Sequence, residues 1–319
     1  MKHPDSEVAV PLAAPSTSHL IQHLIAGGIV LLGAVMFSTK AIMVKLALPY
    51  GIDPVSLLLL RLIFALPFYV GILVWIKAFQ ADAPKIRPYL IQVCLLGFVG
   101  YYLASYFDFV GLSYISASLE RVILYAYPTL VLIISALFLK RPVSMHQMIA
   151  VVLCYAGIFI AVRFGAEQAV PEQRLAGVVL IFLSALTYAI FLVGSGEMIP
   201  KLGVWVFTAC VMIVSAVCVS IHYALEHGEL DVWRYPWQVY SYAGAMALFA
   251  TVIPSLLISE GIKRIGASNA SIIGGVGPIS TIVLASIFLN EVFSYAQMAG
   301  TLLVICGVIY ISINMKRKV

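Results

Sequence analysis

Residues 111–140 read GLSYISASLERVILYAYPTLVLIISALFLK, and residues 261–290 read GIKRIGASNASIIGGVGPISTIVLASIFLN. Extended without gaps to residues 162 and 312, this alignment contains 13 identities in 52 positions. Pro128 matches Pro278, and a Ser-x-x-Gln-Met motif follows in both segments. Apolar composition alone would not readily match a proline inside an apolar run together with a polar motif. The sequence therefore predicts an internal repeat with an offset of 150 residues.

The repeat lies in a chain that is too apolar for a soluble protein. Of its 319 residues, 62% are hydrophobic and 10% are charged, and the mean hydropathy is +1.05. Soluble domains have about 45–50% apolar and roughly 25% charged residues. The sequence contains ten apolar runs close to the ~20 residues that a helix needs to cross a bilayer, at 24–47, 54–76, 89–112, 116–139, 144–163, 175–197, 202–224, 239–262, 267–289 and 293–315. Such runs are too long for the strands of a membrane barrel. The predicted fold class is an all-α integral membrane protein with ten transmembrane helices in two five-helix repeats.

The ends of the chain and the two units have distinct compositions. Residues 1–20 are polar and rich in Pro and Ser, which predicts a disordered cytoplasmic tail. The two repeats are placed at 21–165 and 174–315, and residues 316–319 form a basic cytoplasmic end.

The distribution of basic residues predicts the orientation in the membrane. With the N-terminus inside, twelve Lys and Arg residues fall on the inner side and at most four on the outer side, so the positive-inside rule places both termini in the cytoplasm. Five helices per unit make the repeats inverted, and Lys140-Arg141 accordingly corresponds to Asn290-Glu291. Inverted repeats are typical of secondary transporters, which bind substrate between the repeats near the bilayer midplane.

Several local motifs resemble those of a known family. They are Lys45-Leu-Ala-Leu-Pro-Tyr-Gly with Leu60-Arg61-Leu62, Gly111-Leu-Ser-Tyr-Ile-Ser-Ala-Ser, the mid-helix prolines, and Phe288-Leu-Asn-Glu291. With ten helices in two units, the chain resembles the EamA family of the drug/metabolite transporter superfamily. The resemblance implies a transporter of small organic solutes in the bacterial inner (plasma) membrane. It also implies a cavity lined mainly by helices 1, 3, 4, 6, 8 and 9. Lys140-Arg141 departs from the Gly-Glu that usually ends helix 4.

Six charged residues fall within the predicted spans, where charges usually face protein or water. They are Lys40, Arg61, Asp108, Glu120, Arg121 and Glu260. All except Glu260 lie in the outer half of the first repeat. Three interpretations remain open: ion pairs that hold the first helices together, groups that line the pathway and contact the substrate, or long side chains that reach the membrane surface without a further role.

We assign Lys40, Asp108, Glu120 and Arg121 to the pathway, and Arg61 and Glu260 to structural ion pairs. Because Glu120 and Arg121 point about 100° apart on a helix, one is expected to face the pathway and the other a neighbouring helix. The balanced signs favour a zwitterionic or polar neutral substrate, such as an amino acid. Proton coupling through Asp108 or Glu120 is a further hypothesis, because a desolvated carboxylate titrates nearer neutrality unless an arginine keeps it ionised.

Aromatic and kink-forming residues accompany these charges. Tyr102, Tyr106, Tyr125 and Tyr188 are candidates for the wall of the site, and ordinary packing is the alternative. Pro128 and Pro278, with Gly274, Gly275 and Gly277, are candidates for kinks that move during gating. Static kinks that serve packing are the alternative.

The remaining motifs argue against other functions. The five cysteines form no CxxC pair, and the six histidines lie in the tail or at span ends without an HExxH motif. We expect no metal, no cofactor, no nucleic-acid partner and no enzymatic activity. The partners expected are a small-molecule substrate and the lipid bilayer, for a monomer or a homodimer. A channel-like facilitator is the main alternative to an exporter or exchanger, followed by an intramembrane enzyme.

Overall fold

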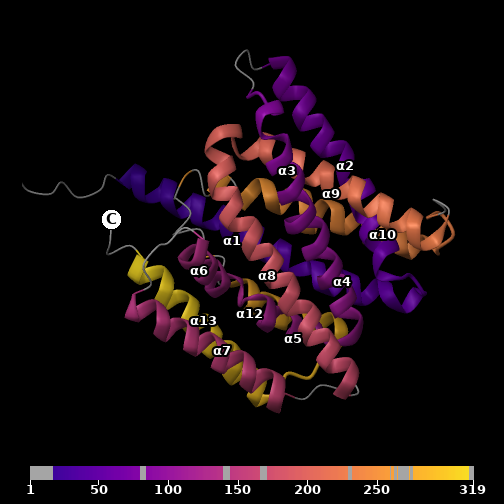
Figure 1. The fold of residues 1–319 in the computed structure, drawn as a ribbon. Coiled ribbons are helices and arrows are strands. Elements are labelled where there is room, and N and C mark those ends of the chain that lie inside the picture. Colours follow the sequence, from indigo (N-terminus) through magenta and orange to yellow (C-terminus); the bar gives the residue numbers. More distant parts are fainter. Residues whose placement is uncertain are drawn as a thin grey trace, which may run out of the picture.

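The computed structural model describes residues 17–79, 84–138, 144–165, 171–228, 232–258, 260, 261, 264, 273 and 276–315. Every regular element in these residues is helical (Figure 1). The first unit contains α1 (Thr17–Ala47), η1 (Leu48–Tyr50), α2 (Pro54–Phe79), η2 (Arg87–Tyr89), α3 (Leu90–Gly97), η3 (Phe98–Leu103), α4 (Ala104–Tyr114), α5 (Ala117–Leu124), α6 (Tyr127–Phe138) and α7 (Met145–Phe164). The second contains α8 (Pro171–Leu202), α9 (Val204–His227), α10 (Trp237–Ala247), η4 (Leu248–Val252), α12 (Val276–Leu289) and α13 (Tyr295–Met315).

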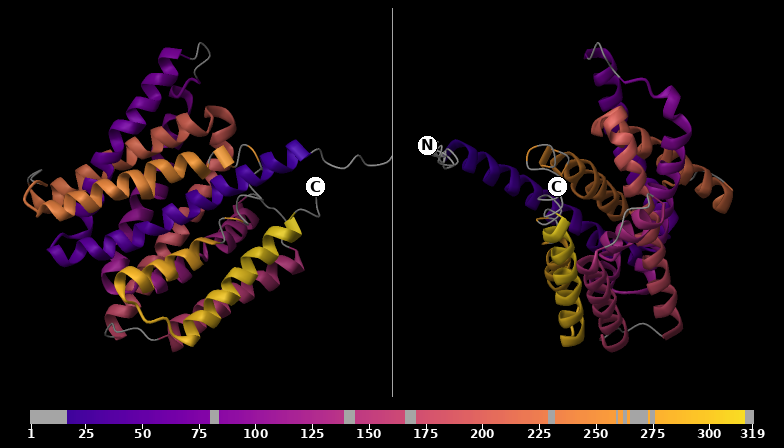
Figure 2. Two further views of the ribbon diagram at one scale, coloured as in Figure 1. Left: turned by 180° about the vertical axis from the view of Figure 1, so that it is seen from behind. Right: turned by 60° about the vertical axis from the view of Figure 1, so that its left-hand side comes forward.

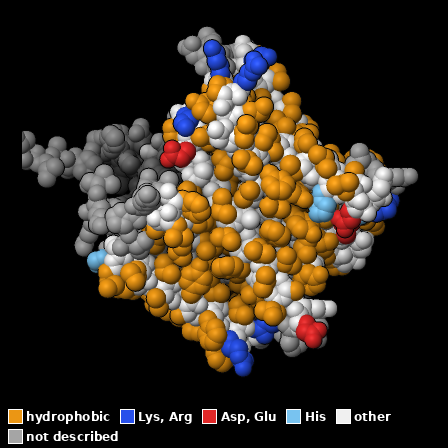
Figure 3. All heavy atoms as spheres, in the orientation of Figure 1, with side chains coloured by type: hydrophobic (Ala, Val, Ile, Leu, Met, Phe, Trp, Pro, Cys, Tyr) orange, Lys and Arg blue, Asp and Glu red, His pale blue; other side chains and the backbone are white. Residues whose placement is uncertain are grey.

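The predicted membrane spans are confirmed in type and order. Within the described residues, eight helices are long and apolar enough to cross a bilayer. The ninth and tenth predicted spans contain shorter apolar helices, Val276–Leu289 and Tyr295–Tyr310. Figure 3 shows a broad apolar surface, with Lys, Arg, Asp and Glu side chains at its margins. This is the surface that lipid would cover. Residues 1–16 and 316–319, which include most of the predicted tail, lie outside the described residues.

The repeat is visible in the backbone as well as in the sequence. The third and eighth spans contain a π-helical segment each, beginning at Phe98 and at Leu248, which are 150 residues apart. The motif that begins at Ser144 is a capping box on α7, and the same two reciprocal bonds join Ser294 and Gln297 before α13. The same local chemistry therefore starts the last helix of each unit.

The packing of the helices follows the same pseudo-symmetry. α8 packs against α4 and α6, and its counterpart α1 packs against α10 and α12. α2 packs against its counterpart α9, and α7 packs along its counterpart α13. The last pair lies side by side at one edge of the molecule in the views of Figures 1 and 2. Because each unit contains an odd number of spans, the two units are inverted relative to each other.

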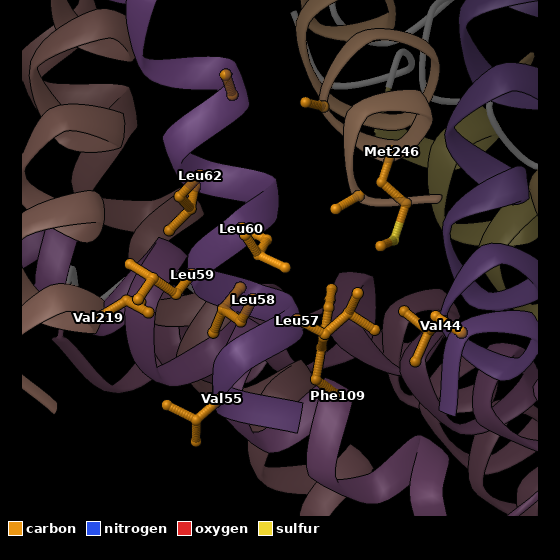
Figure 4. Packing of buried hydrophobic residues seen from close by; sticks show 14 of the residues in the cluster. Val44, Val55, Leu57, Leu58, Leu59, Leu60, Leu62, Phe109, Val219 and Met246 are labelled. Carbon is orange, nitrogen blue, oxygen red and sulfur yellow. The ribbon is translucent and has the colours of Figure 1, made fainter. Parts of the chain in front are cut away.

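The first half of α2 is surrounded by protein on all sides. Four consecutive leucines, Leu57 to Leu60, are at most 1% exposed, which requires neighbours around the whole helix. Figure 4 shows these leucines beside residues of other helices, among them Val44, Phe109, Val219 and Met246. The same packing buries Arg61, the next residue, at 5% exposure.

The α7–α13 pair depends on small residues at the point of closest approach. A Cβ atom added at Gly157 would lie 2.5 Å from the carbonyl oxygen of Gly300 and 2.9 Å from Val304 Cγ2. Cβ atoms do not approach a backbone oxygen so closely, so the helices would have to separate. Close backbone contact through small residues is a common means of helix association in membranes.

We therefore expect Gly157→Ala to destabilise the protein, by an amount in the range of about 1–3 kcal/mol that overpacking causes. The matched control is Gly71→Ala, because a Cβ atom at Gly71 meets nothing within 4 Å and alanine is the better helix former. Thermal unfolding of the purified protein in detergent should show a lower midpoint for Gly157→Ala and an unchanged or higher midpoint for Gly71→Ala. Equal midpoints for the two variants would contradict this packing.

Candidate functional site

A cavity of about 400 Å³ lies between the two repeats. This volume falls within the roughly 300–1,000 Å³ of small-molecule sites. Its wall contains residues of all six helices that the family resemblance implies, and α2 and α9 add Arg61 and Met212. The lining residues from the other spans include Phe37 and Lys40 of α1, Tyr101 and Asp108 of the third span, Arg121 of α5, Tyr188 of α8, Thr251 and Ile258 of the eighth span, and Pro278 of α12.

A buried cluster of charges forms one part of this wall. The Lys40 Nζ atom donates to Asp108 Oδ2 at 2.6 Å and to Glu120 Oε1 at 3.4 Å. Arg121 Nε lies 3.8 Å from Glu120 Oε2, close enough for an ion pair but not for a hydrogen bond. All four side chains are at most 8% exposed. The structure therefore brings the four charged pathway candidates together, across α1, α4 and α5.

The adjacent residues Glu120 and Arg121 point in different directions from α5. Arg121 lines the cavity, whereas Glu120 is fully buried behind the wall and contacts Lys40 of α1. Both lie near the start of α5, where the Ser116 hydroxyl accepts a hydrogen bond from the Leu119 amide and caps the helix. α5 ends at Leu124, before the turn that precedes Pro128.

The two predicted structural charges lie in different surroundings. Arg61 donates from Nη2 to the Ser105 hydroxyl at 3.1 Å, and its guanidinium carbon lies 4.9 Å from the centre of the Phe109 ring. It also lines the cavity. Glu260 accepts a hydrogen bond from Arg264 Nε at 2.7 Å, and both side chains are at least one third exposed. Five of the six charged residues of the predicted spans therefore lie in or behind the cavity wall, and Glu260 lies apart from them.

The predicted tyrosines face two directions. Tyr125 and Tyr188 line the cavity, whereas Tyr102 and Tyr106 do not. Instead, Tyr102 and Tyr106 stack on each other, and the Tyr102 hydroxyl lies 3.0 Å from Nδ1 of His222 on α9. They are each one residue beyond a cavity-lining residue of the third span, which turns them about 100° away from the cavity.

Sequence reasoning missed other lining residues, namely Tyr101, Ser105, Tyr127, Ser184 and Thr251. The spacing of three and four residues between Tyr101, Ser105 and Asp108 could have shown which face of the third span meets the cavity.

Pro128 and Pro278, which match in the repeat, both belong to helices near the cavity. Pro128 is the second residue of α6, after the break that separates α6 from α5. Gly277 and Pro278 belong to α12 and line the cavity. The Ser38 hydroxyl of α1 donates to the carbonyl oxygen of Gly277 at 3.0 Å. Gly274 and Gly275 lie outside the described residues, and a gating role for any of these residues stays a prediction.

The cavity ends at the charge cluster. Among the described residues, its lining stops at Lys40 on α1 and at Asp108 on α4, although both helices continue for about two turns. Beyond the cluster lies the end of the bundle at which α5 begins, which we call the α5 end. There the Glu291 carboxylate accepts hydrogen bonds from the amides of Ala117 and Ser118, at 2.8 and 3.0 Å, and from the Ser118 hydroxyl. Glu291 belongs to the second repeat, so it joins the two repeats at this end.

A second contact between the repeats lies at the same end. Asp53, which precedes α2, accepts a hydrogen bond from the Tyr235 hydroxyl at 3.1 Å and lies 3.4 Å from Nε2 of His227. Burial by itself would raise the pKa of Asp53, but hydrogen bonds from Ser56 and Tyr235 and the nearby His227 hold that pKa below its usual value. The carboxylate is therefore ionised when it makes these contacts.

The charges of the cavity are absent from the second repeat. At an offset of 150 residues, the five charged positions correspond to Ile190, Val211, Ile258, Ala270 and Ser271. The two repeats therefore have similar backbones, but among the described residues only the first contributes charged side chains to the cavity. Within the described part of the chain, no group of three or more His, Cys, Asp or Glu residues is placed to hold a metal ion.

Comparisons with known proteins agree with this architecture. Residues 24–163 and 175–313 each match the model of the EamA-like transporter family. The chain is 31% identical to the uncharacterized transporter YcbK of Bacillus subtilis, over 92% of this chain and 93% of that protein. It is 25% identical to the uncharacterized transporter sll1319 of Synechocystis, over 78% and 76% of the two chains. A protein crystal structure that is 17% identical shares the fold, with a TM-score of 0.63 over 92% of this chain and 98% of the other.

The geometry of the cluster predicts that the contributions of Lys40 and Asp108 to the stability of the protein depend on each other. Replacing one partner of a buried pair leaves the other charge uncompensated, at a cost of about 3–5 kcal/mol. We expect Lys40→Met to lower the unfolding midpoint in detergent strongly, and Lys40→Met with Asp108→Asn to recover part of the loss. The exposed Lys85 serves as the control, and Lys85→Met should leave the midpoint unchanged. Additive losses in the double variant would show that the two groups do not interact.

Proposed function

The chain belongs to the EamA-like transporter family, and from this premise we propose that it is a secondary transporter that works as an exporter or exchanger. Its substrate is a small polar or zwitterionic metabolite, such as an amino acid or a related compound. Transport occurs by alternating access between the two repeats. The observation that carries this proposal is the buried Lys40–Asp108 pair on the wall of a cavity between inverted repeats.

The energetics of the pair favour a function in binding. A charge at the centre of a membrane helix costs about 2.5–3.5 kcal/mol on insertion scales, and a buried ion pair is often no more stable than apolar residues of the same volume. Stability alone therefore does not explain why Lys40 and Asp108 are present, whereas contact with a polar substrate would explain both charges. The tyrosines of the wall supply apolar surface and hydroxyl groups around them.

The contacts at the α5 end support alternating access. Glu291 with the start of α5, and Asp53 with Tyr235 and His227, each join one repeat to the other. A rocking motion that opens the α5 end would break these polar contacts. Such rigid-body motion around a fixed site is the usual mechanism of transporters with inverted repeats.

The proposal includes an orientation. The protein is a multi-pass membrane protein, and we place it in the bacterial plasma membrane with both termini in the cytoplasm, following the distribution of Lys and Arg. The α5 end then faces outward. Asp108 and Glu120 are the candidates for proton coupling, because they are the buried carboxylates among the described residues of the spans.

Counterflow in proteoliposomes tests the carrier mechanism, because a channel does not drive labelled solute uphill in exchange for unlabelled solute. We expect exchange of labelled phenylalanine or of its deaminated analogue 3-phenylpropanoate, which suit an aromatic wall. Lys40→Ala should reduce the exchange rate about tenfold or more, the effect of losing a hydrogen bond to a charged group. The exposed Lys201 provides the control, and Lys201→Ala should exchange normally. Normal exchange by a correctly inserted Lys40→Ala protein would remove Lys40 from the site.

Loss of the Glu291 contact should favour opening of the α5 end. In a cysteine-free background, a Ser105→Cys variant places a thiol on the cavity wall. Adding Glu291→Gln removes the charge that three donors of α5 bind, so labelling of this thiol by a membrane-impermeant reagent from the α5 side should become faster. Glu172→Gln, an exposed acid near the start of α8, is the control. Unchanged labelling in the Glu291→Gln background would show that this contact does not keep the end closed.

A further inference from the structure

The buried charges in and behind the cavity wall do not balance. Among the described residues, the buried charged side chains are three cations and two carboxylates. They are Lys40, Arg61, Arg121, Asp108 and Glu120. With both carboxylates ionised, the cluster has a net charge of +1, and protonation of either one would make it more positive. Glu260 does not compensate, because it pairs with Arg264 and is one third exposed.

Some N–H groups of the two buried arginines make no hydrogen bond. Arg121 Nε and Nη2 and Arg61 Nε are buried and have no hydrogen-bond partner. Both arginine side chains line the cavity and are at most 7% exposed. An arginine in protein cannot lose its proton, and its planar fork of N–H groups matches a carboxylate. Arg121 Nε lies 3.8 Å from the Glu120 carboxylate, whereas Arg121 Nη2 and Arg61 Nε have no acceptor among the described residues. The last two donors are therefore available to an anionic group bound in the cavity.

The rest of the wall limits the size and polarity of the bound molecule. Beside the charges, the cavity is lined by Tyr101, Tyr125, Tyr127 and Tyr188, and by apolar side chains such as Leu124. A molecule that fits has one anionic group directed to the arginines and an apolar or aromatic body against the tyrosines. A polyanion would exceed the single positive charge available.

We propose that this cavity binds a monoanionic carboxylate with an apolar or aromatic body, and that Arg121 binds the carboxylate while Arg61 adds to the positive field. This inference rests on the transport function proposed above and replaces its polar or zwitterionic substrate by a net anion. An amino acid offers the same carboxylate but adds an ammonium group. Asp108 Oδ1 lacks a partner and could accept from that ammonium, but a zwitterion would leave the net charge of the site uncompensated.

The test is equilibrium binding to the full-length protein in detergent, measured by the rise in unfolding midpoint with ligand concentration. The probes share one skeleton and differ in charge: 3-phenylpropanoate (anion), phenylalanine (zwitterion), 3-phenylpropanamide (neutral) and phenylalaninamide (cation). We expect 3-phenylpropanoate to bind about ten- to a hundredfold more tightly than the neutral amide, as a charge-assisted hydrogen bond allows. Phenylalanine should be intermediate, and phenylalaninamide should not bind.

A pair of arginine variants tests whether the preference for the anion arises at the cavity. Arg121→Gln should abolish the preference for the anion over the amide. Arg163→Gln should retain it, because Arg163 is exposed and lies on α7, outside the cavity lining. If Arg121→Gln does not fold, the series with the unmodified protein still decides the proposal.

Three results would overturn the inference: no stabilisation by 3-phenylpropanoate at millimolar concentration, equal or tighter binding of phenylalanine, or an unchanged preference in Arg121→Gln. Different results would contradict the proposed transport function. A carboxylate that binds but is not exchanged in counterflow would contradict transport and leave the binding site intact. Exchange of phenylalanine without binding of the carboxylate would contradict the substrate class and leave the carrier intact.

Discussion

The architecture depends on how one ammonium group is accommodated inside an apolar bundle. Lys40 lies between the carboxylates of Asp108 and Glu120, so a single buried cation joins α1, α4 and α5. A charge removed from water must be paired in place, because nearby lipid offers no partner. The start of α5 and the register of the third span are therefore constrained by this cluster as well as by apolar packing. The same cluster forms the end of the cavity, so the residues that hold these helices together also face the proposed binding site.

The two repeats share a backbone plan and differ in chemistry. The π-helical segments at 98–103 and 248–252, the two capping motifs and the helix contacts repeat with the offset of 150 residues. The charges do not repeat, since Ile258 stands where the second repeat would have the counterpart of Asp108. One repeat thus supplies the ionic part of the wall. The other supplies apolar surface and the Glu291 carboxylate that accepts hydrogen bonds at the start of α5. The wall of the cavity therefore has two chemically different halves.

Much of the site could be predicted from the sequence, because charges in apolar spans are conspicuous. Lys40, Asp108, Glu120 and Arg121 are separated by up to 81 residues, yet the sequence places all four in the outer half of the membrane and so makes an ion-pair set one of its interpretations. The sequence does not show which side of a helix meets the cavity, and this limits the prediction of the tyrosines. Tyr102 and Tyr106 lie at the same depth in the membrane as the cavity, but their side chains point away from it. They face His222 on α9 instead. Glu291 was recognised only as part of a family motif, since its partners are backbone amides that no sequence pattern identifies.

The sequence by itself determined the helical class, the number of spans and the inverted duplication. These follow from run length, from hydropathy and from a fixed offset, which are properties of the chain alone. Only the tertiary structure decided which charges belong to one cluster and which face of each helix meets the cavity. Pairing depends on distances between helices that are far apart in the chain. The sequence already separated Glu260 from the other five charged residues, but only the structure shows that those five are buried together with a surplus of positive charge and that Glu260 pairs with Arg264.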